Sequence, residues 1–134
     1  MFRVSYPLRF AHCDPAGIAY YPRCLELCDA AIEDWTPAVL GDDRRTMHME
    51  RGIGLPTVDL ASTFAAPCKL GDLLDFAVQL TRVGRSSIDL DVAVTCGGAP
   101  RFTVRLTQVL IGLADGVSQP WSPEYRQRLE MECR

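Results

Sequence analysis

The stretch SSIDLDVAVTCGG, residues 86–98, alternates between apolar and polar side chains along most of its length. Its apolar positions are Ile88, Leu90, Val92, Val94 and Cys96. A period of two is typical of a β-strand that buries one face and exposes the other. The pair Gly97-Gly98 follows at once and favours a two-residue hairpin turn, because glycine adopts positive φ freely. We therefore predict a strand over residues 86–96 that is followed by an antiparallel partner.

Four further segments carry the same alternation and predict the rest of a sheet. They cover residues 2–10, 58–64, 73–83 and 101–113. Pro7 in the first segment indicates an edge position or a bulge, because proline cannot donate to a neighbouring strand. In the last segment the apolar phase set by Leu106 slips by one residue at Val109, which suggests a bulge within one long strand.

Residues 22–35 have the spacing of an amphipathic helix, with apolar side chains three and four residues apart. Pro22 suits the first helical position, and Thr36-Pro37 predicts the end. About 14 residues give a helix about 21 Å long. Residues 38–54 are polar, with room for one short helix before Gly52, and the tail carries no clear signal.

The order of these elements, strand, helix and then four strands, predicts an α+β fold with an antiparallel sheet. The length of 134 residues predicts a single domain, 1–134. One helix covers much of one sheet face, but neither the other face nor the edges. An uncovered sheet of this kind favours pairing with a second copy, so we expect at least a homodimer.

Composition excludes several functions. The net charge of −3 provides no overall basic footprint for a nucleic acid. No stretch approaches the roughly 20 apolar residues of a membrane helix, and the first residues have no signal-peptide core. We therefore expect a cytosolic protein that binds neither nucleic acid nor membrane. The six cysteines are then expected to be reduced thiols, and their spacing favours no zinc site or other metal site.

The most informative segment is FAHCDPAGIAYYP, residues 10–22, between the first strand and the helix. Asp14 there has two interpretations. The first is that Asp14 caps a turn, with Pro15 at the next position. The second is that it lies beside the free N–H groups at the helix start, which could hold a developing oxyanion. Asp14 could then attack a carbonyl or activate water.

Four runs of residues follow one another in a recognisable order. They are CDPAGI at 13–18 with YYP at 20–22, ERGI at 50–53 leading to PTV at 56–58, GD at 71–72, and RVGRSS at 82–87. Together they resemble the hotdog-fold acyl-CoA thioesterases, in particular the 4-hydroxybenzoyl-CoA thioesterase group. The resemblance extends from about Val4 to Leu113.

The resemblance implies a hotdog fold, in which a five-stranded antiparallel sheet wraps a long central helix. It also implies a homodimer whose sheet continues across both subunits, often paired into a tetramer as a dimer of dimers. In that family the active sites lie at the subunit interface. The expected activity is hydrolysis of an acyl-CoA to the free acid and CoA, with no cofactor besides the CoA thioester substrate.

Roles carried over from the family fall on two parts of the chain. Asp14 matches the catalytic carboxylate, as nucleophile or general base. Tyr21 matches the residue whose backbone N–H polarises the thioester carbonyl, and Gly17 would keep the turn open. The turn with Arg82, Arg85, Ser86 and Ser87 matches a CoA-phosphate contact, for which arginine is suited. The alternative for this turn is a solvated hairpin.

Other residues and functions leave alternatives open. Glu50 and Arg51 either line the site or form a structural ion pair. His12 departs from the small or acidic residue that many family members carry there, and it is either a polar strand-end residue or one that orients Asp14. A catalytic pair of His12 and Cys13 is disfavoured because adjacent side chains project in different directions.

The acyl group could be aromatic, such as a hydroxybenzoyl group, or aliphatic, and it could be carried by CoA or by a carrier protein. Two rival functions remain: a non-catalytic acyl-CoA-binding module, and a hotdog hydratase or dehydratase. The rivals are distinguished by turnover, because a binding module releases no CoA and a hydratase leaves the thioester intact.

Overall fold

The computed structural model of the chain describes residues 1–133. The strands are β1 (Phe2–Pro7), β2 (Ile53–Gly54), β3 (Thr57–Phe64), β4 (Leu73–Val83), β5 (Ser87–Cys96), β6 (Ala99–Val109) and β7 (Ile111–Gly112). The helices are α1 (Tyr21–Leu40), α2 (Arg44–Met49) and α3 (Pro123–Glu132), and a 3-10 turn covers Phe10–His12.

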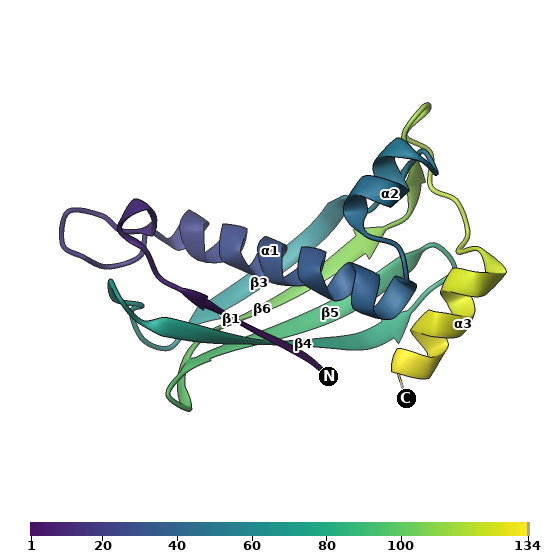
Figure 1. The fold of residues 1–134 in the computed structure, drawn as a ribbon. Helices are drawn as coiled ribbons and strands as arrows, with labels where there is room; N and C mark the ends of the chain where they lie inside the picture. Colours follow the sequence, from purple (N-terminus) through teal and green to yellow (C-terminus); the bar gives the residue numbers. More distant parts are fainter. Residues whose placement is uncertain (134) are drawn as a thin grey trace.

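A five-stranded antiparallel sheet in the order β1-β4-β5-β6-β3 forms the body of the molecule. Helix α1 lies across one face of this sheet (Figure 1). Ile32 and Trp35 of α1 are buried in the same core as Phe76, Leu90 and Val104 of the strands. Alternation along the strands supplies one face of this core, and the helical spacing of α1 supplies the other. The predicted α+β architecture is confirmed.

The central hairpin follows the sequence pattern closely. β4 has the predicted bounds, and β5 begins one residue later than predicted. Cys96 pairs with Ala99 across the turn, and Gly97 and Gly98 both have positive φ, at 57° and 82°. The glycine pair therefore makes the tight turn that the sequence predicted.

The predicted bulge in the last strand is wrong. Gln108 takes the buried position, with 1 % of its surface exposed, so the alternation runs unbroken from Phe102 to Leu110. The apparent slip in phase arises because a polar side chain occupies a buried position. β6 also ends at Val109, and β7 pairs with β2 in a separate two-stranded sheet.

Near the predicted position, the irregularity lies on the partner strand instead. The register of β3 against β6 shifts between Thr57 and Asp59, so Val58 is the extra residue.

The first strand is shorter than predicted. β1 ends at Pro7 because the backbone turns into the 3-10 helix, where the Arg9 N–H donates to Nδ1 of His12 at 2.9 Å. The edge position inferred from Pro7 is confirmed, since β1 is the outermost strand beside β4.

The first helix is longer than predicted. α1 passes through Pro37 and ends at Leu40. Proline removes one backbone hydrogen bond and typically costs about 3 kcal/mol inside a helix. Val39 and Leu40 beyond it are buried, and this burial offsets that cost. Gly41, with φ of 83°, then ends the helix by donating its N–H to the Pro37 carbonyl at 3.0 Å.

Two shorter helices complete the chain. α2 is the short helix expected before Gly52, and its N-cap Asp43 accepts a hydrogen bond from the Thr46 N–H at 2.7 Å. α3 has no counterpart in the sequence prediction. Its N-cap is Ser122, which accepts from the Tyr125 N–H, and Pro123 is its first residue.

The edge strand β3 is uncovered. All eight of its residues are exposed, and Leu60 and Phe64 each leave 43 % of their surface accessible. Among the helices of residues 1–133, none is both long and apolar enough to cross a membrane.

Candidate active site

Residues 12–20 form a narrow hydrogen-bonded loop that carries Asp14. The Tyr20 N–H donates to the His12 carbonyl at 3.0 Å, and the Asp14 N–H donates to the Ile18 carbonyl at 2.9 Å. The Gly17 N–H returns to the Asp14 carbonyl at 3.0 Å, and Gly17 has a φ of 77° that side-chain-bearing residues rarely adopt. The sequence DPAG therefore folds as a tight turn that fixes the backbone of Asp14.

The Asp14 side chain has one oxygen held and one free. Its Oδ1 accepts from the Ala16 N–H at 2.9 Å and from the Ile18 N–H at 3.3 Å. Its Oδ2 has no hydrogen-bond partner within residues 1–133, and the residue is exposed. The turn-capping interpretation is thus correct for Oδ1, while Oδ2 remains available to a reacting group.

Helix α1 begins directly after this loop. Its N-cap Tyr20 makes no side-chain capping bond, and Pro22 follows the first helical residue. Because the first N–H groups of a helix have no intrahelical acceptor, the Tyr21 N–H is left as a donor. The bond from Tyr20 to His12 joins the helix start to the Asp14 loop, so a carboxylate and a free backbone N–H belong to one small unit.

The loop is anchored to the connection between β3 and β4. The Ala19 N–H donates to the Cys68 carbonyl at 2.8 Å, and the Leu70 N–H donates to the Gly17 carbonyl at 2.9 Å. Sequence reasoning identified the neighbouring Gly71-Asp72 pair but missed these two bonds, because backbone contacts leave no pattern in side-chain type.

His12 and Cys13 both bond to Arg9 rather than to Asp14. His12 accepts at Nδ1 from the Arg9 N–H, and the Cys13 thiol donates to the Arg9 carbonyl at 3.4 Å. The structure thus gives His12 a local role at the end of β1.

The predicted CoA-contact turn lies at the far end of the sheet. Asp14 is near the Leu73 end of β4, whereas the other end of β4 and the turn into β5 carry Arg82, Arg85, Ser86 and Ser87. Eleven residues of strand separate the two ends by about 35 Å. One chain therefore does not bring this turn to Asp14.

The same turn is partly engaged with the rest of the fold. Arg82 forms a loose ion pair with Asp89 at 3.8 Å, and the Arg85 side chain is exposed. The Ser86 carbonyl accepts from the Leu110 N–H at 2.7 Å, and the Ser87 carbonyl accepts from Nε1 of Trp121 at 3.3 Å. The two serine hydroxyl groups form no hydrogen bond within residues 1–133.

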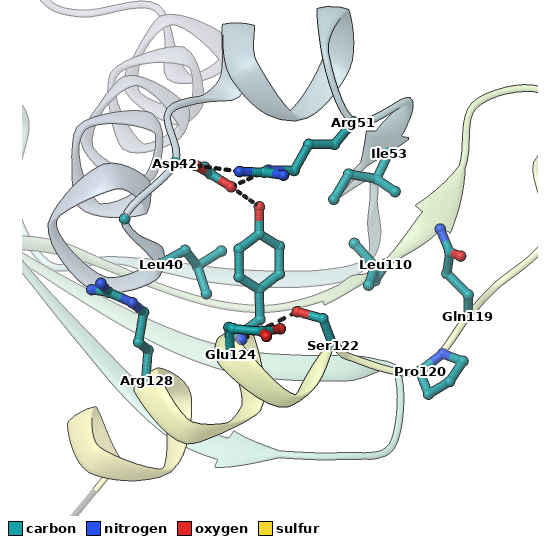
Figure 2. Close-up of a pocket in the computed structure, with 12 residues that line it drawn as sticks. Leu40, Asp42, Arg51, Ile53, Leu110, Gln119, Pro120, Ser122, Glu124 and Arg128 are labelled. Carbon is teal, nitrogen blue, oxygen red and sulfur yellow. Dashed lines mark hydrogen bonds and ion pairs between the residues drawn. The ribbon is translucent and has the colours of Figure 1, made fainter.

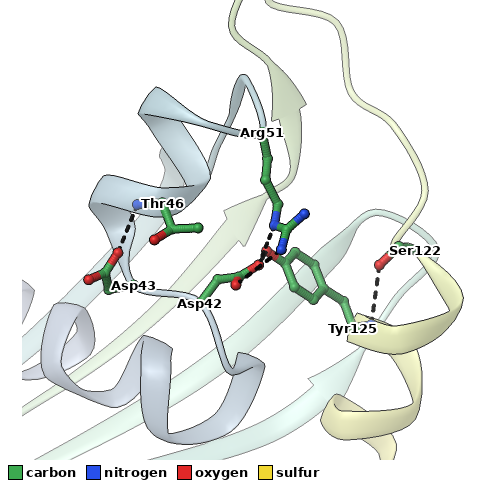
Figure 3. Close-up of polar contacts among 6 residues, drawn as sticks. All are labelled: Asp42, Asp43, Thr46, Arg51, Ser122 and Tyr125. Atoms are coloured by element: carbon green, nitrogen blue, oxygen red, sulfur yellow. Dashed lines mark hydrogen bonds and ion pairs between the residues drawn. The ribbon is translucent and has the colours of Figure 1, made fainter.

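A cavity of about 570 Å³ lies between the end of α1 and α3, and sequence reasoning did not foresee it. Asp42, Arg51 and Tyr125 line it, and Figure 2 shows Asp42 and Arg51 meeting on its wall. Arg51 pairs with Asp42 at 2.5 Å rather than with Glu50, and the Tyr125 hydroxyl donates to the same carboxylate at 2.5 Å (Figure 3). These two donors hold the pKa of Asp42 below its usual value. Arg51 is therefore in a structural ion pair.

Neither Asp14 nor Tyr21 lines this cavity, which lies at the Leu40 end of α1, opposite the Tyr21 end. Residues 1–133 contain no group of three or more His, Cys, Asp or Glu side chains that could hold a metal ion. The groups available for chemistry near the start of α1 are thus the Asp14 carboxylate and the Tyr21 backbone N–H.

The sequence profile of the thioesterase-like superfamily matches residues 8–129. The chain belongs to this superfamily.

Relatives and solved structures agree with this membership. A 1,4-dihydroxy-2-naphthoyl-CoA hydrolase of Synechococcus elongatus is 30 % identical over 73 % of this chain and 72 % of its own length. A thioesterase-superfamily structure from Jannaschia sp. has a TM-score of 0.91 at 25 % identity, covering 99 % of this chain and 93 % of that one. A gentisyl-coenzyme A thioesterase has a TM-score of 0.85 at 20 % identity, covering 93 % and 99 %.

The predictions of the hotdog fold, of the thioesterase family and of an enzyme that hydrolyses CoA thioesters are therefore confirmed. For this thioesterase, the individual roles of Asp14, Gly17, Tyr21 and the residue 82–87 turn stay predictions.

Proposed function

We propose that this thioesterase hydrolyses an aromatic acyl-CoA to the free acid and CoA, with Asp14 as the catalytic carboxylate. The observation that carries the proposal is the Asp14 side chain itself. Its Oδ1 is fixed by two backbone N–H groups, its Oδ2 is free, and its loop is bonded to the uncapped start of α1. A carboxylate used only to cap a turn would not need a free helix donor beside it.

The proposed chemistry uses both groups. The Tyr21 N–H and the helix dipole polarise the thioester carbonyl and hold the oxyanion that develops. Oδ2 of Asp14 then either attacks the carbonyl carbon or removes a proton from a water molecule that attacks it. Attack by Asp14 breaks the carbon–sulfur bond, expels the CoA thiolate and leaves a mixed anhydride, which water hydrolyses to regenerate the carboxylate. Gly17 supports this role by setting the turn.

Two observations favour an aromatic acyl group. Phe10, Tyr20 and Tyr21 present exposed rings around the Asp14 loop, and the two tyrosine rings lie edge to face with centroids 5.6 Å apart. Aromatic surface of this kind suits a flat aromatic ligand. The naphthoyl-CoA hydrolase and the gentisyl-CoA thioesterase act on hydroxylated aromatic acyl groups, by their names.

The proposed enzyme is a homodimer that pairs through β3. This edge strand presents unpaired backbone groups together with exposed Val58, Leu60 and Phe64, a combination that favours addition of another strand. Antiparallel pairing with a second β3 would continue the sheet and cover these side chains. The expected dimer of dimers and cytoplasmic location stay predictions.

A dimer also explains how the CoA-contact turn could contribute to an active site. The turn with Arg82, Arg85, Ser86 and Ser87 is too far from Asp14 of its own chain, and two-fold pairing at β3 reverses the direction of the second sheet. We therefore assign the turn to the site that contains the partner subunit's Asp14. Its arginines would bind CoA phosphates by charge-assisted hydrogen bonds.

The test is free CoA released from a panel of aromatic and aliphatic acyl-CoA esters, measured by chromatography because six cysteines would react with a thiol dye. We expect hydrolysis, with the highest kcat/KM on an aromatic ester. Binding of acyl-CoA without CoA release across the panel would contradict the proposal and favour a binding module. Hydration of an enoyl-CoA with an intact thioester would favour a hydratase.

A further inference from the structure

Arg44, the first residue of α2, is a half-buried cation that the proposed reaction does not use. Its Nε donates to the Thr36 hydroxyl at 3.0 Å, and its Nη2 donates to Oε1 of Gln108 at 3.3 Å. Within residues 1–133 no carboxylate forms a salt bridge with it. Both acceptors are neutral, and the nearby carboxylates of Asp29 and Glu33 on α1 favour the charged form of Arg44 without bonding to it.

The acceptors are themselves fixed. Thr36 is fully buried and donates its hydroxyl to the Ile32 carbonyl at 2.8 Å. Gln108 is also buried and donates from Nε2 to the Thr57 hydroxyl at 3.3 Å. A series of hydrogen-bonded side chains thus extends from α1 through Arg44 and Gln108 to the exposed edge strand β3.

A guanidinium group has five N–H donors, and within residues 1–133 two of those of Arg44 are used. Burial lowers the pKa of Arg44, with opposing effects from Asp29 and Glu33 on α1, yet an arginine remains charged at neutral pH. Burying a cation whose hydrogen-bond acceptors are neutral is costly even with two carboxylates nearby, whereas an exposed arginine on this short helix would cost little. Arg44 is thus a fixed donor whose remaining N–H groups are left for an oxygen that residues 1–133 of one chain do not supply.

The position of Arg44 relative to Asp14 decides where that oxygen comes from. Arg44 bonds to Thr36, fifteen residues along α1 from Tyr21, which corresponds to about 22 Å in the same chain. An aromatic acyl group is too short to reach from one to the other. Antiparallel pairing at β3, however, sets the Thr57 end of one strand beside the Phe64 end of the other. The Asp14 loop is bonded to Cys68, just after Phe64.

We propose that Arg44 acts in the site of the partner subunit's Asp14, where it binds a ring oxygen of a hydroxylated aromatic acyl group and so determines substrate specificity. This inference rests on the proposed function and on pairing at β3. A phosphate of CoA is the less suitable ligand, because a half-buried guanidinium with neutral partners matches one oxygen at the inner end of a substrate. A hydrogen bond from such a cation to a hydroxyl group discriminates strongly against a substrate that lacks it.

The first test compares kcat/KM on benzoyl-CoA with kcat/KM on its 2-, 3- and 4-hydroxy derivatives. We expect wild type to prefer at least one hydroxylated ester, and Arg44→Gln to lower kcat/KM on that ester by about 10- to 100-fold with little change on benzoyl-CoA. Arg44→Lys keeps a cation and should give an intermediate ratio. The matched control is Arg45→Gln, which removes the next arginine on α2, an exposed one, and should leave the ratio unchanged.

The outcomes separate this inference from the proposed function. Failure of wild type to hydrolyse any ester contradicts the proposed function. An active wild type without preference for a hydroxyl group overturns the role of Arg44 alone. An equal loss of kcat/KM on all esters in Arg44→Gln and Arg44→Lys would also overturn the role of Arg44 in specificity, since such a loss indicates a structural role only.

A mixed dimer tests the assignment to the partner subunit. Subunits carrying Asp14→Asn and Arg44→Gln are given different affinity tags, and the heterodimer is purified. If the two residues act across the interface, one site keeps both, and the heterodimer has about half the wild-type activity on the preferred hydroxylated ester. If they act within one chain, no site keeps both, and activity stays at or below half that of the Arg44→Gln homodimer.

Discussion

The hydroxyl group of Tyr125 donates a hydrogen bond of 2.5 Å to the carboxylate of Asp42, and this bond ties the C-terminal helix to the end of α1 (Figure 3). Arg51 donates to the same carboxylate, so three separate parts of the chain meet at one side chain. Tyr125 is buried, whereas Asp42 is only partly covered. The cluster therefore holds α3 in place at a point remote from Asp14.

Tyr125→Phe removes the hydroxyl donor and leaves the ring in place. We expect the free energy of unfolding to fall by about 1–2 kcal/mol, because a hydrogen bond to a charged group is lost. Urea denaturation followed by circular dichroism measures this change. Tyr20→Phe is the control, since Tyr20 is exposed. An unchanged denaturation midpoint in Tyr125→Phe would refute this role for the bond.

The same carboxylate makes stability depend on pH. The pKa of Asp42 is lowered in the folded chain by hydrogen bonds from Arg51 and Tyr125. A carboxyl group with a lowered folded pKa stabilises the protein above its unfolded pKa of about 3.9 and loses that contribution as the pH falls through the folded value. Wild type should therefore exceed Asp42→Asn in unfolding free energy at pH 7, and the gap should shrink below about pH 4. A gap that is constant from pH 7 to pH 2.5 would contradict this expectation.

Gly17→Ala tests the turn that holds Asp14. Apart from the chain neighbours of Gly17, no atom of residues 1–133 lies within 4 Å of a Cβ built there, so the cost arises from the positive φ of 77°. We expect a stability loss of about 1–2 kcal/mol and a lower kcat. Gly116→Ala is the matched control, because Gly116 also has positive φ, at 69°, and open space around it. Equal activity in the two variants would exclude a role for the Gly17 turn in catalysis.

Leu60→Glu tests pairing through β3. A carboxylate at the centre of this edge strand would face its copy across a two-fold axis and weaken the dimer by charge repulsion. Sedimentation velocity should then give a monomer, with thioesterase activity reduced because each site lacks its partner. Val117→Glu, a substitution of another exposed apolar residue in a loop, should leave the dimer intact. The expectation fails if Leu60→Glu sediments as wild type does.

Local patterns in the sequence were sufficient to predict an element where the side-chain period and the turn residues indicate the same backbone structure. The alternation in residues 73–96 and the Gly97-Gly98 pair predicted the central hairpin almost residue by residue, because period and turn chemistry are both local. Asp14 was identifiable as a candidate for the same reason: a Pro and a Gly beside a carboxylate just before a helix form a recognisable turn.

Two of the departures have the same physical cause, which is tertiary burial. Pro37 should end a helix, yet the chain continues because Val39 and Leu40 reach the core. Gln108 interrupts the apolar pattern of β6, yet it is buried because Arg44 and Thr57 satisfy its amide. No single residue in the sequence predicts such tertiary contacts.

Asp14→Asn tests the central claim most directly. Asparagine keeps the side-chain oxygen that accepts from Ala16 and Ile18, so the turn should persist while the reacting carboxylate is lost. Asp115→Asn is the matched control, because Oδ1 of Asp115 likewise accepts from a backbone N–H, that of Val117, at 3.0 Å. The measurement is CoA release from the preferred aromatic ester, quantified by chromatography. We predict that this release nearly disappears in Asp14→Asn and is unchanged in Asp115→Asn. Equal activity in Asp14→Asn and wild type would contradict the proposed mechanism.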